Sequence, residues 1–382
     1  MISPARIAAF DILLDVSQGG YATDLLLART ASLDPRDAGL AHELVLGTLR
    51  RQAQLDFLAD RHLSRKKLDA PVRIALRMGI HQLRHLDRVP AHAAVDESVE
   101  LVKRARLKSA SGLVNAVLRK ITRAPAAWPD ASVELSCPSW LLAQWESEYG
   151  AAAARKAAEA ALEEPGRWVR WTGPPDPSLE PTEVPGCFRV ARGCEPPAGA
   201  RFQDIGAQSI APLLDLAPGQ SFLDLCAAPG NKTAQALESG VRAIACDLHP
   251  RRLETVTGCP RVALDAARPL PFSARFDRIL VDAPCSGTGT LARNPEIKWR
   301  LQPESIAGLA HLQRAILRNA LKHLKPDGRL VYSTCSLERA ENQAVVDAVA
   351  AGTPGLRVLQ TVVRLPGAAP GDGFFAAVLA LV

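Results

Sequence analysis

The sequence has no apolar run that approaches the ~18 residues of a membrane-spanning helix, and its first residues lack the apolar core of a signal peptide. Its 8 cysteines include no CxxC pair, which argues against a disulfide framework and a zinc knuckle. Internal repeats and low-complexity tracts are also absent. We therefore expect a cytoplasmic protein with reduced thiols, without a metal or a membrane partner, that acts as a monomer.

The size and charge of the chain suggest separate modules. Its 382 residues exceed the ~150 residues of an ordinary domain. Residues 1–125 hold 20 Lys and Arg against 13 Asp and Glu, whereas the remainder is close to neutral. A basic module beside a neutral one indicates a polyanion-binding part and a catalytic part. A solvated, Arg-rich helical surface explains the same charge equally well.

Three segments differ in their hydrophobic pattern. Residues 1–125 show apolar side chains at helical spacing with proline near several expected helix starts, which predicts an all-helical domain. Residues 126–200 are rich in Pro and Gly and contain strand-like pieces at 167–171 and 187–190, so we expect a small intermediate domain or connector. Residues 201–382 form the third predicted domain.

In this third domain, apolar runs of strand length alternate with helical stretches. The runs are SFLDLC, VRAIACD, PRVALD, FDRILVD and GRLVYST, followed by a final strand-like segment at 374–381. The alternation predicts an α/β fold, with a parallel sheet covered by helices on both faces.

The loop after SFLDLC is made of small residues, which let a ligand approach the backbone at the edge where parallel sheets bind ligands. It comprises Cys226, Ala227, Ala228, Pro229, Gly230, Asn231 and Lys232. Later strands end in Asp247, Asp265 and Asp282. A carboxylate at Asp247 suits a ribose diol, and one at Asp265 suits an exocyclic amine. A tight turn with chance acidic residues is the alternative explanation.

The sequence lacks two motifs that bind the phosphates of nucleotides, and their absence narrows the choice of ligand. Neither G-x-G-x-x-G nor GxxxxGK[ST] is present, although Lys232-Thr233 superficially suggests the second. A ligand with ribose and adenine but no phosphates fits better. S-adenosylmethionine is such a ligand, and we expect it as the cofactor.

Two cysteines follow neighbouring predicted strands on the cofactor edge. Cys285 lies in DAPCSG and Cys335 in STCS. A single cysteine is usually a small buried hydrophobe, but two at adjacent strand ends point to thiol chemistry. C5 of cytosine is too weak a nucleophile to attack a sulfonium methyl group, and a thiolate that adds to C6 makes C5 enamine-like. A second thiol, or a water beside it, can help the later elimination.

Two further residues are candidates for the same chemistry. Asp282 is placed to hydrogen-bond N3 and the amino group of the base. Lys232 is a candidate for lowering a thiol pKa or positioning the base, and an exposed lysine at a helix start is an equally good explanation. A target base must leave its stack to reach such a pocket, so we expect single-stranded or flippable RNA as the partner.

At this point the motifs are recognisable. LDLCAAPGNKT, VDAPCSGTGTLARNPEIKW and LVYSTCSLERAENQAVV resemble the RNA cytosine-C5 methyltransferases of the RsmB/Sun (Fmu) family, in the NOL1/NOP2/Sun class. QDIGAQS and DGFFAAVLA resemble flanking elements of the same family. RVPAHAAVDESVELVKRARLKSASGLVNAVLRK resembles a NusB-like RNA-binding domain. The resemblance implies a Rossmann-like S-adenosylmethionine-dependent methyltransferase sheet at 201–382, behind a NusB-like domain at 1–125.

The resemblance also implies roles for individual residues. Cys335 would be the nucleophile, and Cys285 would assist release of the methylated product. Cys226 to Lys232 would line the methionine and ribose part of the cofactor, with Asp247 on the ribose and Asp265 on the adenine amine. Asp282 would lie between the cofactor and the target base. The implied substrate is 16S ribosomal RNA.

This chain departs from the family pattern at three positions. Asn231 replaces a glycine, and Asn294 and Glu296 stand where His and Asp are frequent. Asn tolerates a left-handed backbone, so we expect the loop to keep its shape.

Three other functions remain as alternatives. The first is methylation of transfer RNA or another RNA, because the motifs determine chemistry rather than target. The second is a non-catalytic NusB-like RNA-binding scaffold, against which the complete set of thiols and acidic strand ends argues. The third is a DNA cytosine methyltransferase, in which the cysteine after the fourth strand would be the nucleophile.

Overall fold

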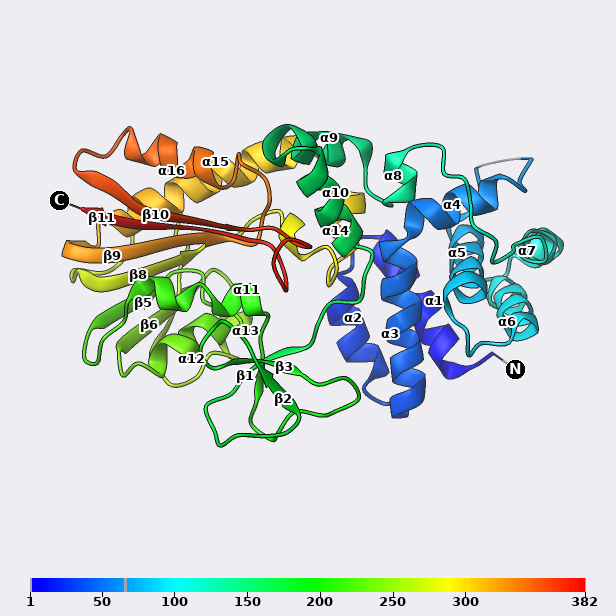
Figure 1. Ribbon diagram of the computed structural model, residues 1–382, viewed down its shortest axis with the longest axis horizontal. Helices are drawn as coiled ribbons and strands as arrows, with labels where there is room; N and C mark the ends of the chain where they lie inside the picture. The colour runs from blue at the N-terminus through cyan, green and yellow to red at the C-terminus, as the bar shows by residue number, and fades with distance from the viewer. Residues whose placement is uncertain (1, 65–66, 382) are drawn as a thin grey trace. The chain divides into compact units, whose positions relative to one another are not determined.

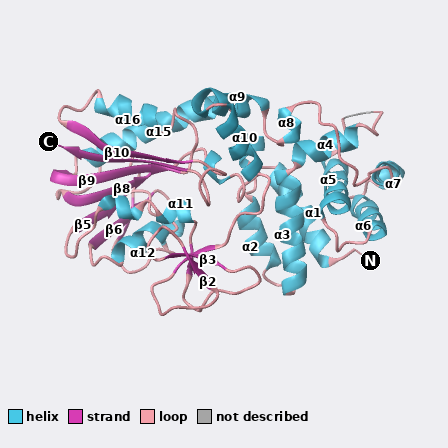
Figure 2. Cartoon of the chain, in the orientation of Figure 1, coloured by secondary structure: helices cyan, strands magenta, loops and turns pink. Residues whose placement is uncertain are grey.

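The computed structural model describes residues 2–64 and 67–381, and the chain divides into two compact units (Figure 1). The helical unit comprises the chain up to Glu164 together with Leu291–Arg300. The sheet unit comprises Pro165–Thr290 and the chain from Leu301 onward. All strands of the described residues belong to the sheet unit (Figure 2).

The helical unit confirms the all-helical prediction for the described part of residues 1–125. Its helices are α1 (Pro4–Ser17), α2 (Ala22–Thr30), α3 (Pro35–Arg50), α4 (Gln52–Asp60), α5 (Ala70–His85), α6 (Ala91–Arg104), the 3-10 turn η1 (Lys108–Ala110), α7 (Ser111–Leu118), α8 (Ala131–Glu134), α9 (Ser139–Tyr149), α10 (Ala151–Ala160) and α14 (Ile297–Arg300). Helices α1, α3 and α5 pack against one another around a continuous apolar core. Asp34 caps α3 by accepting the backbone N–H groups of Arg36 and Asp37.

Leu291–Arg300 is an unexpected member of the helical unit, because it belongs to a predicted methyltransferase motif. Trp299 Nε1 donates to the Leu49 carbonyl at 2.9 Å, and Lys298 Nζ donates to the Arg50 carbonyl at 2.8 Å. The segment therefore satisfies carbonyl groups at the C-terminal end of α3, which otherwise lack intrahelical partners.

The two positions of this segment that depart from the family pattern contact α2. Buried Glu296 accepts the backbone N–H of Ala22 at 3.0 Å, and Asn294 accepts the hydroxyl of Thr23 at 3.1 Å. A carboxylate at a helix N-terminus satisfies a free N–H group and interacts favourably with the helix dipole. Both departures are therefore compatible with the packing of this unit.

The predicted intermediate segment at 126–200 is shared between the two units. Its helices α8, α9 and α10 belong to the helical unit, and its strands belong to the sheet unit. The boundaries expected at residues 125 and 200 stay a prediction, because compactness in space does not test independent folding.

A small antiparallel sheet opens the sheet unit. Its strands are β1 (Trp168–Arg170), β2 (Leu179–Pro181), β3 (Cys187–Val190) and β4 (Arg201–Phe202), in the order β2-β3-β1-β4. The strand pieces predicted at 167–171 and 187–190 correspond to β1 and β3. The Arg170 guanidinium bonds the carboxylate of Glu238, just beyond α12 (Asn231–Leu237), which ties this small sheet to the rest of the unit.

The large sheet has the order β10-β11-β9-β8-β5-β6-β7. Its strands are β5 (Ser221–Asp224), β6 (Arg242–Asp247), β7 (Arg261–Ala263), β8 (Phe276–Asp282), β9 (Leu324–Thr334), β10 (Leu356–Arg364) and β11 (Phe374–Leu381). The first five pair in parallel, as predicted, whereas β10 and β11 run antiparallel. This mixed sheet is a Rossmann-like arrangement, and β10 is an edge strand that the sequence reading missed.

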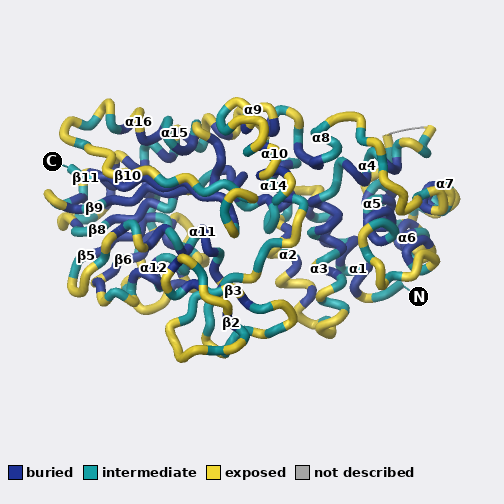
Figure 3. The backbone as a smooth tube through the Cα atoms, in the orientation of Figure 1, coloured by how far each residue is buried: buried dark blue, intermediate teal, exposed yellow. Residues whose placement is uncertain are grey.

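Successive residues of the central strands face two different cores, which is the period-two pattern of a sheet covered on both sides. Leu223 and Ile279 pack on the side of α15 (Pro303–Leu321) and α16 (Gln343–Ala350). Phe222 and Leu280 pack in the opposite core. That side carries α11 (Ile205–Gln208), η2 (Ala211–Leu214), α12 (Asn231–Leu237) and α13 (Pro250–Leu253), and Figure 3 shows the central strands as buried.

One short element completes the described chain. The 3-10 turn η3 (Thr288–Thr290) follows β8 and precedes the segment that joins the helical unit. None of the described helices is both long and apolar enough to cross a bilayer.

Candidate active site

The two predicted catalytic cysteines lie side by side. Cys285 follows β8 and Cys335 follows β9, and these parallel strands are neighbours in the sheet. Their Sγ atoms are 3.4 Å apart. The bond to Cys335, together with burial, raises the pKa of the Cys285 thiol well above its usual range. Cys285 therefore remains a thiol and can donate its hydrogen to the sulfur of Cys335.

A partly buried ion pair lies beside the thiols. Lys232 Nζ, from the start of α12, is 2.6 Å from Asp282 Oδ2 at the end of β8, and the Ser333 hydroxyl donates to Asp282 Oδ1 at 2.8 Å. Burial alone would lower the pKa of Lys232, but Asp282 and, to a smaller extent, Cys335 raise it overall. Lys232 is thus a charged, oriented ammonium group rather than an exposed lysine at a helix start.

A cavity of about 270 Å³ opens at the carboxyl ends of the strands. Five of the predicted cofactor residues line it, namely Cys226, Ala228, Asp247, Asp265 and Asp282. Ala227, Pro229, Gly230, Asn231 and Lys232 are not among its lining residues, although they belong to the same loop. Asp282 is shared between this cavity and the ion pair with Lys232, so the cavity adjoins the thiol cluster.

Hydrogen bonds fix the two acidic groups that the sequence assigned to ribose and adenine. Asp247 accepts the backbone N–H groups of Ala228 at 3.1 Å and His249 at 2.9 Å. Asp265 accepts the backbone N–H of Ala267 at 2.9 Å. Each carboxylate retains acceptor capacity, because a carboxylate has about four lone-pair sites.

The loop geometry explains why Asn231 is compatible with the family pattern. Gly230 adopts the left-handed conformation, with φ 104°, and a Cβ atom there would meet Val256 at 3.0 Å. Asn231 is instead the first residue of α12. The position that requires a glycine is therefore occupied by one.

Other polar groups near the strand ends are structural. Asp224 is 1% exposed, and burial raises its pKa to about 7, while the Thr233 hydroxyl donates to it at 2.7 Å. Burial also raises the pKa of Cys226 well above its usual range and that of Cys246 to about 12. These two thiols remain protonated and act as small apolar groups.

Sequence reasoning missed the apolar walls of the cavity. They are Leu225, Leu248, Leu264, Ala266, Pro284, Leu312 and Ile316. Leu248, Ala266 and Pro284 each lie within two residues of an acidic strand end. That proximity was an available signal for them, whereas Leu312 and Ile316 come from α15 and could be placed only by the fold. Carboxylates beside apolar walls suit a ligand with a ribose, an amine and a flat adenine ring.

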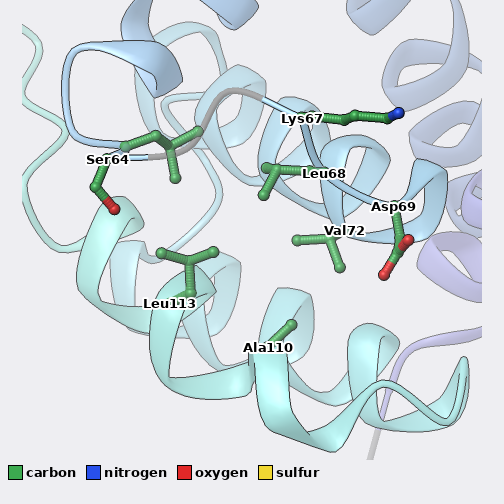
Figure 4. Close-up of a pocket in the computed structure, with 8 residues that line it drawn as sticks. Ser64, Lys67, Leu68, Asp69, Val72, Ala110 and Leu113 are labelled. Carbon is green, nitrogen blue, oxygen red and sulfur yellow. The ribbon is translucent and has the colours of Figure 1, made fainter.

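The helical unit contains a larger hollow, of about 660 Å³, that is a weaker candidate (Figure 4). Its lining is mostly apolar, with Ser64, Lys67 and Asp69 as the polar members. No thiol lines it.

Within residues 2–64 and 67–381, no group of three or more His, Cys, Asp or Glu side chains is arranged to hold a metal ion.

Two family models match separate parts of the chain. Residues 211–380 match the family described as 16S rRNA methyltransferase RsmB/F, and residues 3–123 match the NusB family. Among solved structures, the crystal structure of PH0851 has a TM-score of 0.82 at 20% identity and covers 100% of this chain and 99% of that one. A methyltransferase homolog protein from Pyrococcus horikoshii has a TM-score of 0.56 at 24% identity, with 66% of this chain and 97% of that chain covered. At these identities the likeness concerns the fold alone.

Curated relatives extend the match to nearly the full length. Ribosomal RNA small subunit methyltransferase B of Citrobacter koseri is 34% identical, with 95% of each chain covered. The protein of the same name from Vibrio vulnificus is 34% identical, with 98% of each chain covered. The chain therefore belongs to the RsmB/F family of RNA methyltransferases, whose methyl donor is S-adenosylmethionine, and it carries an N-terminal NusB-family domain.

Proposed function

We propose that this enzyme methylates C5 of a cytosine in 16S ribosomal RNA, with Cys335 as the covalent nucleophile. The observation that carries the proposal is the contact between the thiols of Cys285 and Cys335, 3.4 Å apart beside a cavity with the predicted cofactor carboxylates. When bound, S-adenosylmethionine supplies an electrophilic methyl group. Asp247 and Asp265 would hold its ribose and adenine.

In the first step, the Cys335 thiolate adds to C6 of the base. The new S–C6 bond moves electron density to C5, which becomes nucleophilic enough to accept a methyl group. Lys232 would place a positive charge near the Cys335 sulfur, because the two groups interact electrostatically. Asp282 would accept a hydrogen bond from the amino group of the base, and Lys232 and Ser333 fix its orientation.

Product release requires the loss of the C5 proton and cleavage of the S–C6 bond. The leading cause of the raised Cys285 pKa is its bond to the Cys335 sulfur. Once Cys335 is a neutral thioether, its sulfur no longer opposes a negative charge on Cys285. Cys285 then releases its own proton to solvent, takes the proton from C5, and the Cys335 thiolate leaves. This sequence leaves Cys335 as a thiolate and Cys285 as a thiol that carries the former C5 proton, which are the states in which the two sulfur atoms began.

The RNA target is proposed from the curated relatives, which are named as small-subunit ribosomal RNA methyltransferases. The experiment that tests both chemistry and target is bisulfite sequencing of unmodified 16S RNA incubated with enzyme and S-adenosylmethionine. We expect one protected cytosine, and incubation with transfer RNA serves as the comparison. An unprotected 16S RNA beside a protected transfer RNA would reassign the target, whereas methyl incorporation without any protected cytosine would refute the C5 chemistry.

A further inference from the structure

A buried carboxylate that the proposed mechanism does not use lies behind the thiols. Glu341 is 0% exposed and precedes α16. Its Oε1 accepts the backbone N–H of Ser286 at 2.9 Å and the Nε2 of Gln313 at 3.0 Å. Its Oε2 accepts the Ser336 hydroxyl at 2.6 Å and, by a short bond, the Ser286 hydroxyl. Four donors from three separate segments therefore converge on one carboxylate.

The partners of Glu341 determine what this carboxylate holds. Ser286 directly follows Cys285, and Ser336 directly follows Cys335. Gln313 Nε2 also donates to the carbonyl of Pro284, the residue before Cys285, at 2.9 Å. The carboxylate is therefore hydrogen-bonded to both turns that carry the thiols, in each case at the residue that follows the cysteine.

The backbone of Glu341 is fixed as well. The Tyr332 hydroxyl, from β9, donates to the Glu341 carbonyl at 2.5 Å. Asn342 Nδ2 donates to the Ser336 carbonyl at 2.8 Å, which binds the same turn a second time. A buried carboxylate that loses its donors is costly, so this network favours one arrangement of the two turns.

We propose that Glu341 is a positioning residue of methyl transfer, which holds the turns after β8 and β9 together so that the two thiols stay in contact. This inference rests on the proposed function for its link to catalysis. Glu341 does not line the cofactor cavity, so its loss affects turnover rather than cofactor binding. A displacement of about 1 Å at reacting groups reduces rates by roughly 100-fold.

The variants are Glu341→Ala and Glu341→Gln, with Asp277→Asn as the matched control. Asp277 starts β8 at the end opposite the thiols, where it accepts hydrogen bonds from Ser221 and Lys325. Its substitution weakens hydrogen bonds at the opposite end of β8 without touching either cysteine turn. Glu341→Gln preserves the size of the side chain and one acceptor oxygen for Ser286. This variant can therefore be measured if Glu341→Ala does not fold.

Two readouts are needed. The first is kcat and KM for RNA and for S-adenosylmethionine. The second is the equilibrium of the folded protein with oxidised and reduced glutathione, in which both thiols are oxidised to a disulfide and one oxidised glutathione is reduced to two thiols. The equilibrium constant gives the effective concentration of the Cys285 thiol relative to the Cys335 thiol, which falls when the two turns move apart. The measurement needs no RNA.

We expect both Glu341 variants to lower kcat by roughly 10- to 100-fold with each KM unchanged, and to lower the effective concentration of the thiols by a similar factor. Asp277→Asn should change neither. Folded Glu341 variants that keep the wild-type effective concentration would overturn the inference. If wild-type enzyme methylates no cytosine while the thiol equilibrium still depends on Glu341, the positioning inference stands and the proposed function fails.

Discussion

The Sγ atoms of Cys285 and Cys335 lie 3.4 Å apart at the ends of two neighbouring parallel strands. The contact with Cys335, together with burial, raises the pKa of the Cys285 thiol well above its usual range. Two thiols in contact suit two distinct steps, one nucleophilic and one acid-base.

Asp282→Asn should weaken both turnover and stability. The change removes the counter-charge of the partly buried Lys232, which lies 2.6 Å away, and leaves an ammonium group without its ion-pair partner. We expect the free energy of unfolding to fall by roughly 1–3 kcal/mol, and kcat to fall by about 100-fold. Urea denaturation and single-turnover methylation measure the two effects. An unchanged kcat in a folded variant would remove Asp282 from the mechanism.

Asp247→Asn should weaken cofactor binding specifically. The amide retains the shape of the side chain but loses part of its acceptor capacity for a ribose diol. We expect the Kd of S-adenosylhomocysteine, measured by calorimetry, to rise by about tenfold. Glu254→Gln, just beyond α13 and outside the cavity lining, is the control and should leave the Kd unchanged. Equal affinities for wild type and Asp247→Asn would exclude the ribose assignment.

Removal of residues 1–164 should abolish methylation by the remaining fragment. The segment Leu291–Arg300 follows the Cys285 turn closely in sequence, yet Trp299 and Lys298 bond carbonyl groups of α3. Without α3 these groups lose their partners, so we expect fast hydrogen exchange at 286–300. Residues 1–164 supplied in trans should slow this exchange and restore activity. A fragment with wild-type exchange and turnover would contradict this role of the helical unit.

Lys298 should make stability depend on pH above neutrality. Burial lowers the pKa of Lys298 to about 7; Cys137 raises it, and Arg50 and Arg51 lower it further. The unfolded lysine titrates near pH ~10.4, so between about pH 7 and pH 10 the unfolded state binds more protons. The free energy of unfolding therefore rises with pH across this window.

Lys298→Met should flatten that dependence. Urea denaturation at a series of pH values measures the slope for wild type and variant. Lys156→Met, an exposed lysine of α10, is the control and should retain the wild-type slope. Parallel slopes for wild type and Lys298→Met would mean that Lys298 remains charged in the folded protein.

The sequence allowed the parallel core and the site to be predicted because their signals are local. Strands such as β8 carry short buried apolar runs, in this case residues 279–281, and the candidate catalytic groups follow them directly. β10 gave no such signal, because an edge strand with most side chains exposed lacks a buried face. Glu341 also escaped notice, since a glutamate in a polar stretch is usually a solvated surface residue.

The sequence did not indicate that Leu291–Arg300 belongs to the helical unit, and only the structure showed it. Buried Lys298 and Glu296 look like ordinary surface charges in sequence, and their partners lie more than 200 residues away along the chain. Only the folded chain brings Arg50 and Ala22 to them. Long-range pairings of this kind leave no periodic signature in a single sequence.

The identity of the nucleophile is tested most directly by trapping the covalent complex between enzyme and unmodified 16S RNA. Cys285→Ser should accumulate an RNA–protein adduct that survives denaturing electrophoresis, because Cys335 can attack but release is impaired. Cys335→Ser should form none. An adduct that persists in Cys335→Ser and vanishes in Cys285→Ser would contradict the assignment of Cys335 as the attacking thiol.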